Sequence, residues 1–191
     1  MIEHVLQIAA WVELAICWIA WSLAFIRPRR LAPRNQKVVR APQSRLGILF
    51  NLLGFACICA YVHPFGLQKS VLSLVMSMLI GPPSVMLGWA ATRHLGRFWR
   101  YEAAVTEDHE LIKSGPYALM RHPIYGSMLG MMLATGTAYT WWPMFAAGIL
   151  LFLIGTEIRV RAEDRLLEQF FQDEFVEYRA RVPSGFIPFL S

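Results

Sequence analysis

Long apolar runs leave this sequence few ways to fold. They cover residues 5–26, 46–62, 71–92, 124–137 and 142–158. A helix needs roughly 20 apolar residues to cross a hydrocarbon core of about 30 Å, and each run reaches or approaches that length. The pattern predicts an all-α integral membrane protein with about five transmembrane helices.

Charged residues are scarce and lie between these runs. They make up 16% of the chain, against roughly 25% in an average soluble domain. The formal net charge of +5 would in itself be compatible with nucleic-acid binding. However, the Lys and Arg residues separate apolar runs and do not line one face of a soluble domain. We therefore expect membrane lipids, and no nucleic acid, as partners.

The distribution of basic residues also predicts an orientation. The loop 27–45 holds seven Lys and Arg residues and no acid, and more basic residues follow in the polar stretch 93–123 and after residue 158. The opposite connections, 63–70 and 137–142, hold one Lys between them. Because cytoplasmic loops carry the excess of positive charge, we expect the N-terminus outside and both polar segments on the cytoplasmic face.

The tail 159–182 has the pattern of an amphipathic helix. Its apolar residues recur at three- and four-residue intervals and are Leu166, Leu167, Phe170, Phe171, Phe175 and Val176. Polar residues such as Glu168 and Glu177 lie between them. The spacing predicts a C-terminal helix that leaves the membrane and lies against its cytoplasmic face.

Metal chemistry is not expected. The three cysteines, Cys17, Cys57 and Cys59, all lie inside apolar runs, where cysteine usually acts as a small apolar residue. No His accompanies them at a metal-ligand spacing. With only three thiols, we also expect no disulfide framework.

The first polar cluster that can carry chemistry lies before the fourth apolar run. It extends from His109 through Gly115-Pro116-Tyr117 to Arg121-His122-Pro123. Basic residues and a Pro at a helix start can simply anchor that helix at the membrane interface. Yet Gly115-Pro116 and His122-Pro123 bracket a short loop that holds more polar and aromatic side chains than an anchor needs.

The second cluster lies where the fifth apolar run meets the tail, and it contains Glu157, Arg159, Arg161, Glu163 and Asp164. Glu157 and Arg161 are four residues apart, as are Arg159 and Glu163, so each pair can meet on one helix face. A solvated face at a helix exit accounts for Arg161. Ionisable groups at membrane depth usually face a cavity or a partner, which makes Glu157 and Arg159 candidates for function.

In their order and spacing, these motifs resemble those of the isoprenylcysteine carboxyl methyltransferase family and its relatives, which include phospholipid N-methyltransferases. The first similar stretch is His109-x-Leu111-Ile112-x-x-Gly115-Pro116-Tyr117, followed by Arg121-His122-Pro123-x-Tyr125. The second is Arg159-x-x-x-Glu163, followed by Phe175-x-x-Tyr178-x-x-Arg181-Val182-Pro183. The resemblance covers residues 94–191, about half of the chain.

The resemblance implies that S-adenosylmethionine binds in a cytoplasmic pocket closed by the C-terminal tail. By position, the implied cofactor-binding residues are Glu102, His109, Glu110, Leu111, Ile112, Tyr117, His122, Pro123, Ile124, Tyr125 and Glu163. Arg159 is expected to face the methyl acceptor, and Arg159 and Glu163 are the expected catalytic residues. The family often has paired glutamates, whereas here the second acid is Asp164, so we rank Glu163 above it.

We expect the whole chain, 1–191, to form a single transmembrane methyltransferase domain. Its N-terminal helices would occupy 1–92 and its catalytic half 93–191. The N-terminal part is similar to the family only in being transmembrane.

The chemistry of methyl transfer narrows the choice of acceptor. Displacement at a sulfonium mainly requires alignment of the acceptor, methyl carbon and sulfur. A carboxylate acceptor needs no base and can be held by Arg159, whereas an amine must first lose a proton to Glu163, Asp164 or His122. Arg159 therefore favours a lipophilic carboxylate, such as that of a prenylated cysteine, entering from the bilayer. A phospholipid amine, a small thiol and a non-catalytic membrane protein are the alternatives.

Overall fold

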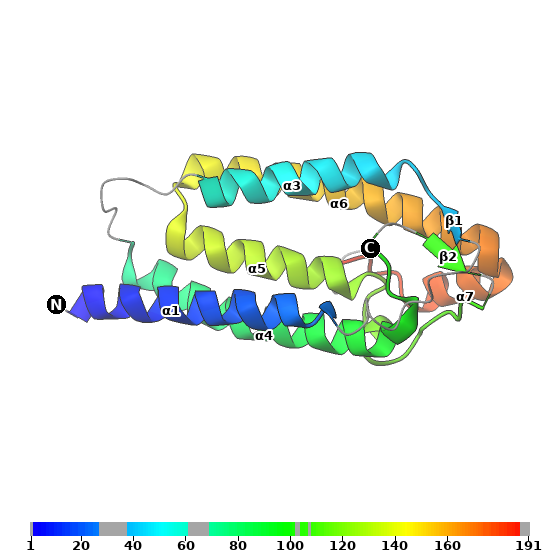
Figure 1. Cartoon of the computed structure of the whole chain (residues 1–191), viewed down its shortest axis with the longest axis horizontal. Coiled ribbons are helices and arrows are strands. Elements are labelled where there is room, and N and C mark those ends of the chain that lie inside the picture. The colour runs from blue at the N-terminus through cyan, green and yellow to red at the C-terminus, as the bar shows by residue number, and fades with distance from the viewer. Residues whose placement is uncertain (1, 27–37, 61–68, 102–103, 107, 188–191) are drawn as a thin grey trace.

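The computed structural model describes residues 2–26, 38–60, 69–101, 104–106 and 108–187 (Figure 1). Glu102, most of the basic loop and the end of the second apolar run lie outside the described residues. Within the described part, the chain forms six α-helices and one two-stranded sheet. The predicted helical class is therefore confirmed, and the small sheet is an addition to it.

The helices are α1 (Ile2–Leu23), α3 (Ser44–Ala60), α4 (Val71–Leu95), α5 (Pro123–Tyr139), α6 (Trp142–Phe171) and α7 (Asp173–Arg181). Two short 3-10 helices, Gly96–Phe98 and Gly115–Ala118, lie in the polar stretch. Strand β1 (Val38–Arg40) pairs antiparallel with β2 (Ala104–Thr106). This pairing connects the segment just before α3 with the polar stretch that follows α4.

In the part of the chain that the structure describes, each predicted apolar run contains a helix, but only some of these helices reach the length of a membrane span. Among the described residues, α1, α4 and α6 are long and apolar enough to cross a membrane, and α3 is a shorter apolar helix. Helix α5 has 17 residues, which is about 25 Å at 1.5 Å per residue. The expectation of about five crossings is thus supported for three helices by length and composition.

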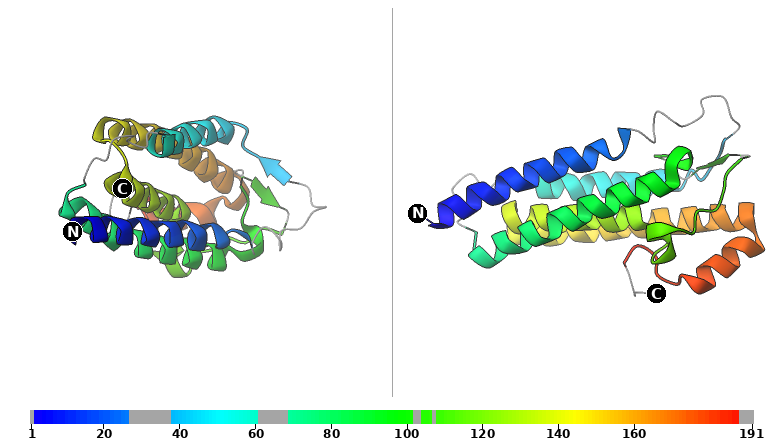
Figure 2. Two further views of the ribbon diagram at one scale, coloured as in Figure 1. Left: turned by 60° about the vertical axis from the view of Figure 1, so that its left-hand side comes forward. Right: turned by 90° about the horizontal axis from the view of Figure 1, so that it is seen from below.

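Helix α5 lies inside the bundle. It contacts α1, α3, α4 and α6, and Figures 1 and 2 show it between the α1–α4 pair and the α3–α6 pair. Its buried residues include Ser127, Met131, Met132, Ala134 and Thr135. Since its neighbours enclose it, α5 need not match the thickness of the hydrocarbon core.

Paired glycines bring α3 and α6 close together. A Cβ atom at Gly47 of α3 would lie 2.5 Å from the carbonyl oxygen of Gly155, and one at Gly148 of α6 would lie 2.9 Å from that of Gly54. Small residues at such crossings let two helix backbones approach in lipid, where no hydrophobic effect drives helices together. The same Gly47 position would also meet the Cγ of Arg159 at 2.5 Å. The glycine pairs therefore fix the depth at which Arg159 lies.

The tail differs from its predicted form. We expected an amphipathic helix over 159–182, separate from the fifth apolar run, but α6 continues unbroken through both as one 30-residue helix. Most residues after Arg159 have good helix propensity, so the helix continues. Ala162 and Leu166 are buried, so one face of this part of α6 still packs against the rest of the protein. The chain turns only at Gln172, whose φ of 49° is left-handed. Helix α7 follows as a separate short helix.

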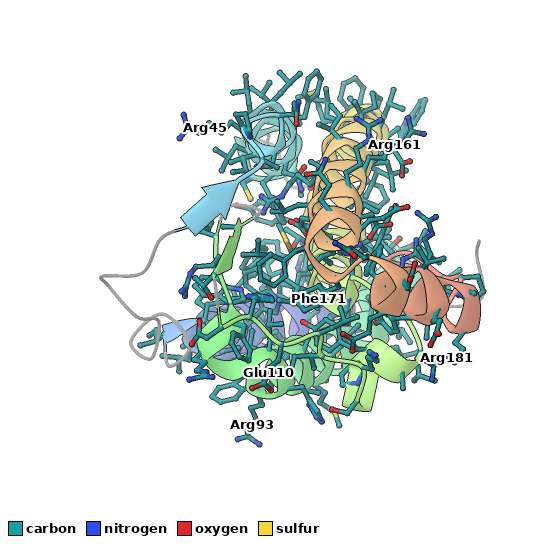
Figure 3. The ribbon with its side chains drawn as sticks, turned by 90° about the vertical axis from the view of Figure 1, so that its right-hand side faces the viewer. Arg45, Arg93, Glu110, Arg161, Phe171 and Arg181 are labelled. Atoms are coloured by element: carbon teal, nitrogen blue, oxygen red, sulfur yellow. The ribbon has the colours of Figure 1, made fainter. Side chains whose placement is uncertain are left out.

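The polar segments gather at one end of the bundle. In Figure 1, β1, β2 and α7 lie at the end opposite the N-terminus. Figure 3 looks onto this end and shows the side chains of Arg93, Arg161 and Arg181 pointing outward around it. Both predicted polar clusters therefore lie on the same side of the bundle, as the alternation of runs and loops predicts.

The glycine crossing generates a prediction. Gly148→Leu should separate α3 from α6 and lower stability by about 1–3 kcal/mol, the usual cost of overpacking a close contact. Ala147→Leu adds the same side chain at the neighbouring exposed position and should leave stability nearly unchanged. Thermal unfolding in detergent micelles measures both, and equal midpoints for the two variants would contradict the close packing.

Candidate functional site

A cavity of about 610 Å³ lies between the helices at the polar end. Most of the residues that the sequence singled out line it: His109, Glu110, Leu111, Ile112, Tyr117, His122, Ile124, Tyr125, Arg159 and Glu163. Pro123 is buried at the start of α5 but does not line the cavity, and Glu102 lies outside the described residues. The cavity therefore brings together the cluster at residues 109–125 and the cluster at residues 157–164, which are more than thirty residues apart in the sequence.

The cavity has two chemically different parts. Its polar lobe, as we call it, is formed by the polar stretch, the start of α5 and the charged part of α6, and includes His109, His122 and Glu163. Its apolar lobe extends between α1 and α3 and is lined by Trp18, Trp21, Phe25, Ile48, Leu52, Phe55 and Met128. The rings of Trp18 and Phe55 pack edge to face at 5.7 Å and join the two helices there.

The apolar lobe reaches the outer surface of the bundle. Ile26 and Leu52 both line the cavity, yet they are 44% and 55% exposed. These residues belong to the chain just after α1 and to the middle of α3. Since that surface is apolar, the lobe opens toward the side of the bundle that would contact lipid.

Arg159 is a buried cation of the site. It is 7% exposed, its Nε donates to the hydroxyl of Tyr125 at 2.8 Å, and a terminal nitrogen donates to the carbonyl of Tyr101 at 2.8 Å. Its guanidinium carbon lies 5.1 Å from the ring centre of Tyr125 and 5.9 Å from that of Tyr101. These hydrogen bonds and the contacts with both tyrosine rings hold the guanidinium of Arg159 in one orientation.

Glu163 lies one helical turn beyond Arg159 and lines the cavity. Its Oε1 lies 3.9 Å from Arg159 and accepts a hydrogen bond from Tyr125. Its Oε2 lies 3.3 Å from Nδ1 of His122. The neighbouring Asp164 does not line the cavity. Asp164 instead pairs with Arg121 and His122.

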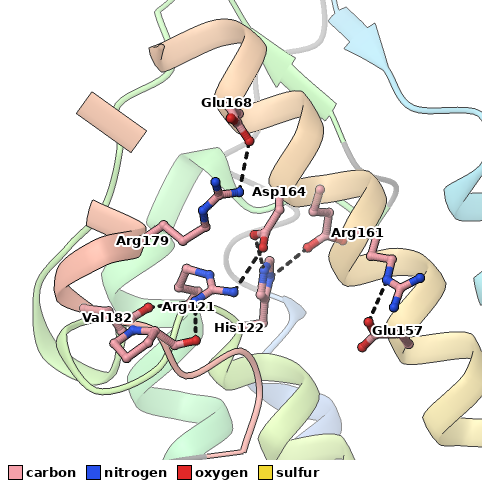
Figure 4. A network of polar contacts seen from close by, with 10 residues as sticks. Arg121, His122, Glu157, Arg161, Asp164, Glu168, Arg179 and Val182 are labelled. Carbon is pink, nitrogen blue, oxygen red and sulfur yellow. Dashed lines mark hydrogen bonds and ion pairs between the residues drawn. The ribbon is translucent and has the colours of Figure 1, made fainter. Parts of the chain in front are cut away.

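His122 sits between two carboxylates. While Nδ1 faces Glu163, Nε2 lies 2.8 Å from Asp164, whose other oxygen binds Arg121 at 3.2 Å (Figure 4). Burial disfavours the charged imidazole, but the hydrogen bonds and charges of Asp164 and Glu163 outweigh this and raise the pKa of His122 to about 9. The side chain is therefore an imidazolium at neutral pH, with both nitrogens engaged.

Arg121 ties the C-terminal segment to this site. Its guanidinium donates to the carbonyls of Val182 and Pro183 at 2.7 and 2.6 Å, and its backbone N–H donates to Ser184 at 3.0 Å. The hydroxyl of Tyr178 in α7 donates to the carbonyl of Tyr117 at 2.6 Å. The segment after α6 therefore packs against the wall of the polar lobe.

His109 differs from His122 in its surroundings. Burial, helped by the positive charge of Arg100, lowers the pKa of His109 to about 4. Its ring centre lies 4.8 Å from that of Phe98 and 6.0 Å from that of Phe171. At neutral pH this side chain is a neutral hydrogen-bonding group between aromatic rings.

Sequence reasoning overlooked the contribution of the N-terminal helices. Trp18, Trp21 and Phe55 form much of the apolar lobe, and Asn51, a lone polar residue in the second apolar run, also lines the cavity. Glu157, in contrast, pairs with Arg161 at 2.7 Å and does not line it. The signal that could have revealed Asn51 is the amide itself, since polar side chains are rare within membrane segments.

The residues around the site show no metal-binding arrangement. In the described part of the chain, no group of three or more His, Cys, Asp or Glu side chains is placed to hold a metal ion. The carboxylates instead pair with cations of the chain.

Comparison with known proteins gives one family. The model of the isoprenylcysteine carboxyl methyltransferase (ICMT) family matches residues 74–169. That range contains His109, His122, Arg159 and Glu163. It includes nearly all of α4 and α6 and the whole of α5.

Similar proteins carry different names. The chain is 25% identical over 164 residues to the uncharacterized protein YpbQ of Bacillus subtilis. The aligned region covers 84% of this chain and 97% of YpbQ. It is 35% identical over 142 residues to protein-S-isoprenylcysteine O-methyltransferase B of Arabidopsis thaliana (69% of this chain, 61% of that one). It is 30% identical over 143 residues to the cobalt-zinc-cadmium resistance protein CzcN of Cupriavidus metallidurans (68% and 65%).

The chain therefore spans less than two thirds of the named plant methyltransferase and of CzcN. The family match, however, extends over half of the chain and contains the charged residues that line the cavity. On that evidence, this chain belongs to the isoprenylcysteine carboxyl methyltransferase family.

Proposed function

We propose that this protein is a membrane-embedded methyltransferase that uses S-adenosylmethionine to methylate the carboxylate of a lipophilic acceptor, such as the terminal carboxylate of a prenylated cysteine. The observation that carries the proposal is the position of Arg159. This buried cation lines a cavity that joins a polar lobe to an apolar lobe open toward lipid. An amphiphilic anion matches both parts.

The polar lobe suits the cofactor chemically. S-adenosylmethionine supplies, when bound, an electrophilic methyl group on a sulfonium. Glu163 offers a carboxylate to an amino or ribose hydroxyl group, and the neutral His109 beside Phe98 and Phe171 offers stacking and hydrogen bonding to a heterocycle. The cavity volume also lies within the range of roughly 300–1,000 Å³ usual for small-molecule sites.

The balance of charge favours an anionic acceptor. Five ionic groups alternate through the site in the order Arg159, Glu163, His122, Asp164 and Arg121. With His122 protonated, this set has three positive and two negative charges. A bound carboxylate next to Arg159 would neutralise the excess, and buried charges are tolerated best when paired.

The same groups are poorly suited to an amine acceptor. An ammonium must lose its proton before it can attack, but both nitrogens of His122 are already engaged with carboxylates. Glu163 lies between the cations His122 and Arg159, which stabilise its charged form and make it a weak base. Methylation of a carboxylate needs no base, so the residues present are sufficient for it. A thiolate next to Arg159 is the remaining alternative.

We further propose that the acceptor enters between α1 and α3, past Ile26 and Leu52, and that the polar end lies in the cytoplasm with the N-terminus outside. The excess of basic residues at that end supports the orientation. Because α1 and α3 contribute most of the apolar lobe while the 93–191 half forms the polar lobe, we regard the chain as one catalytic domain.

The cofactor site predicts that Glu163→Gln weakens S-adenosylmethionine binding by about tenfold or more, since a charge-assisted hydrogen bond becomes a neutral one. Calorimetric titration of the detergent-purified protein measures the affinity. Glu157→Gln, on the same helix but outside the cavity, is the matched control and should bind as the wild type does. Unchanged affinity in Glu163→Gln would remove Glu163 from the site.

The acceptor site predicts a different effect for Arg159. Arg159→Ala should bind S-adenosylmethionine within a few-fold of the wild type but lose about 100-fold or more in turnover, since the oriented cation is lost. Transfer of a radiolabelled methyl group to N-acetyl-S-farnesylcysteine measures turnover, and Arg161→Ala serves as the control. If the wild-type protein binds S-adenosylmethionine but transfers no methyl group to this acceptor, thiols and amines become the acceptors to test. No binding by folded protein would overturn the proposed function.

The charge state of His122 predicts how stability depends on pH. Folding raises the pKa of His122 from 6.5 to about 9, so its contribution is complete below pH 6.5, diminishes as the pH rises and is lost once the pH passes about 9. The thermal midpoint of the ligand-free protein should therefore fall over this range. The fall should be smaller in His122→Gln, which starts from a lower midpoint. Parallel pH profiles for the two proteins would show that His122 is not charged.

A further inference from the structure

The hydroxyl of Tyr125 connects two charged groups of the candidate site. Tyr125 lies in the first turn of α5, is 5% exposed and lines the cavity. Its hydroxyl accepts a hydrogen bond from Nε of Arg159 at 2.8 Å and donates one to Oε1 of Glu163. A terminal nitrogen of Arg159 lies 3.9 Å from that same Oε1, which is beyond hydrogen-bond distance. The hydrogen-bonded link between the two charged groups therefore passes through the hydroxyl.

The chemistry of the three side chains fixes the direction of both bonds. An arginine has only donors and an ionised carboxylate has only acceptors, whereas a tyrosine hydroxyl has one proton and can also accept. The proton of Tyr125 must therefore point to Glu163, and a lone pair of its oxygen must point to Arg159. Hydrogen bonds in such a series polarise one another. A change at one charged group is therefore felt at the other.

The ring and the backbone of Tyr125 are held independently of its hydroxyl. The ring centre lies 5.1 Å from the guanidinium carbon of Arg159 and 5.8 Å from the ring centre of His122. The backbone N–H donates to the carbonyl of His122 at 3.1 Å. The substitution Tyr125→Phe keeps these contacts and removes only the two hydrogen bonds of the hydroxyl.

Without the hydroxyl, the two charged groups would pair directly. Arg159 and Glu163 are four residues apart on α6, a spacing at which opposite charges meet on one helix face. Nε of Arg159 would lose its partner, while a terminal nitrogen would keep the carbonyl of Tyr101. The guanidinium could then turn toward Glu163, and each group would neutralise the other rather than a ligand. The hydroxyl thus keeps both charges available.

We propose that Tyr125 is a positioning residue that couples the two ligands of the site, so that a cofactor bound at Glu163 raises the affinity of Arg159 for the carboxylate of the acceptor. A cofactor group that donates to Glu163 fixes that carboxylate, and through the hydroxyl of Tyr125 it fixes the orientation of Arg159. The acceptor then binds a cation that is already ordered, which lowers the entropy lost on binding. Linkage requires the acceptor to raise the affinity for the cofactor by the same factor. The inference rests on the proposed function.

Binding of one ligand in the presence of the other tests the coupling. S-adenosylhomocysteine takes the place of the cofactor, because it lacks the methyl group and no transfer can occur. Calorimetric titration of the full-length protein in detergent micelles measures its affinity for N-acetyl-S-farnesylcysteine, with and without saturating S-adenosylhomocysteine. The wild type should bind the acceptor about fivefold more tightly, or better, when S-adenosylhomocysteine is present. In Tyr125→Phe this coupling factor should fall to about one or below.

Tyr178→Phe is the matched control. Tyr178 also lines the cavity, and its hydroxyl donates to the backbone carbonyl of Tyr117. This variant therefore loses a buried hydrogen bond that is not part of the link between Arg159 and Glu163, and it should keep the coupling factor of the wild type. Methyl transfer gives a second comparison. Loss of the coupling raises KM for the acceptor, whereas loss of folded protein lowers only the apparent kcat.

The outcomes distinguish this inference from the proposed function. If the wild type binds the two ligands independently, or if Tyr125→Phe keeps the coupling factor, the role of Tyr125 is overturned and the proposed function stands. The same conclusion follows if Tyr178→Phe loses the coupling to the same extent as Tyr125→Phe. If the folded wild type fails to bind N-acetyl-S-farnesylcysteine, the proposed acceptor class and the coupling are both overturned.

Discussion

A charge buried inside a protein must be neutralised there, and the site of this protein is arranged around that requirement. Arg159 projects from α6 into the cavity and is 7% exposed, and Tyr125 and Glu163 are its first partners. Glu163 in turn is paired with His122, which is paired with Asp164 and through it with Arg121. Each ion pair holds the next, because an unpaired charge there would be strongly unfavourable.

This chain of charges also connects distant parts of the sequence. It begins on α6, crosses to the start of α5 and ends at the carbonyls of the C-terminal segment. The glycine crossing of α3 with α6 sets the position of Arg159 at one end, and the bonds of Arg121 hold the tail at the other. Electrostatic pairing and close helix packing therefore define the shape of the cavity together.

Much of the fold and of the polar site could be predicted from the sequence. Each of the five apolar runs contains a helix among the described residues, and most residues of the His109–Tyr125 motifs line one cavity together with Arg159 and Glu163. The boundary at residue 159 was wrong, because charge alone does not end a helix whose residues keep good propensity and an inward-facing side. The position of Glu157 outside the cavity could not be predicted for a related reason, since spacing alone does not tell which face of α6 meets the cavity.

The sequence by itself determined the helical class, the separation of polar and apolar segments and the identity of the charged groups, because these follow from local composition and periodicity. Only the tertiary structure decided that α5 is enclosed, that Trp18 and Asn51 share a cavity with Arg159, and that His122 is held between two carboxylates. The physical reason is that burial and the pairing of charges depend on contacts between residues far apart in the chain. A run of apolar residues does not specify which of its faces meets lipid and which meets a neighbouring helix.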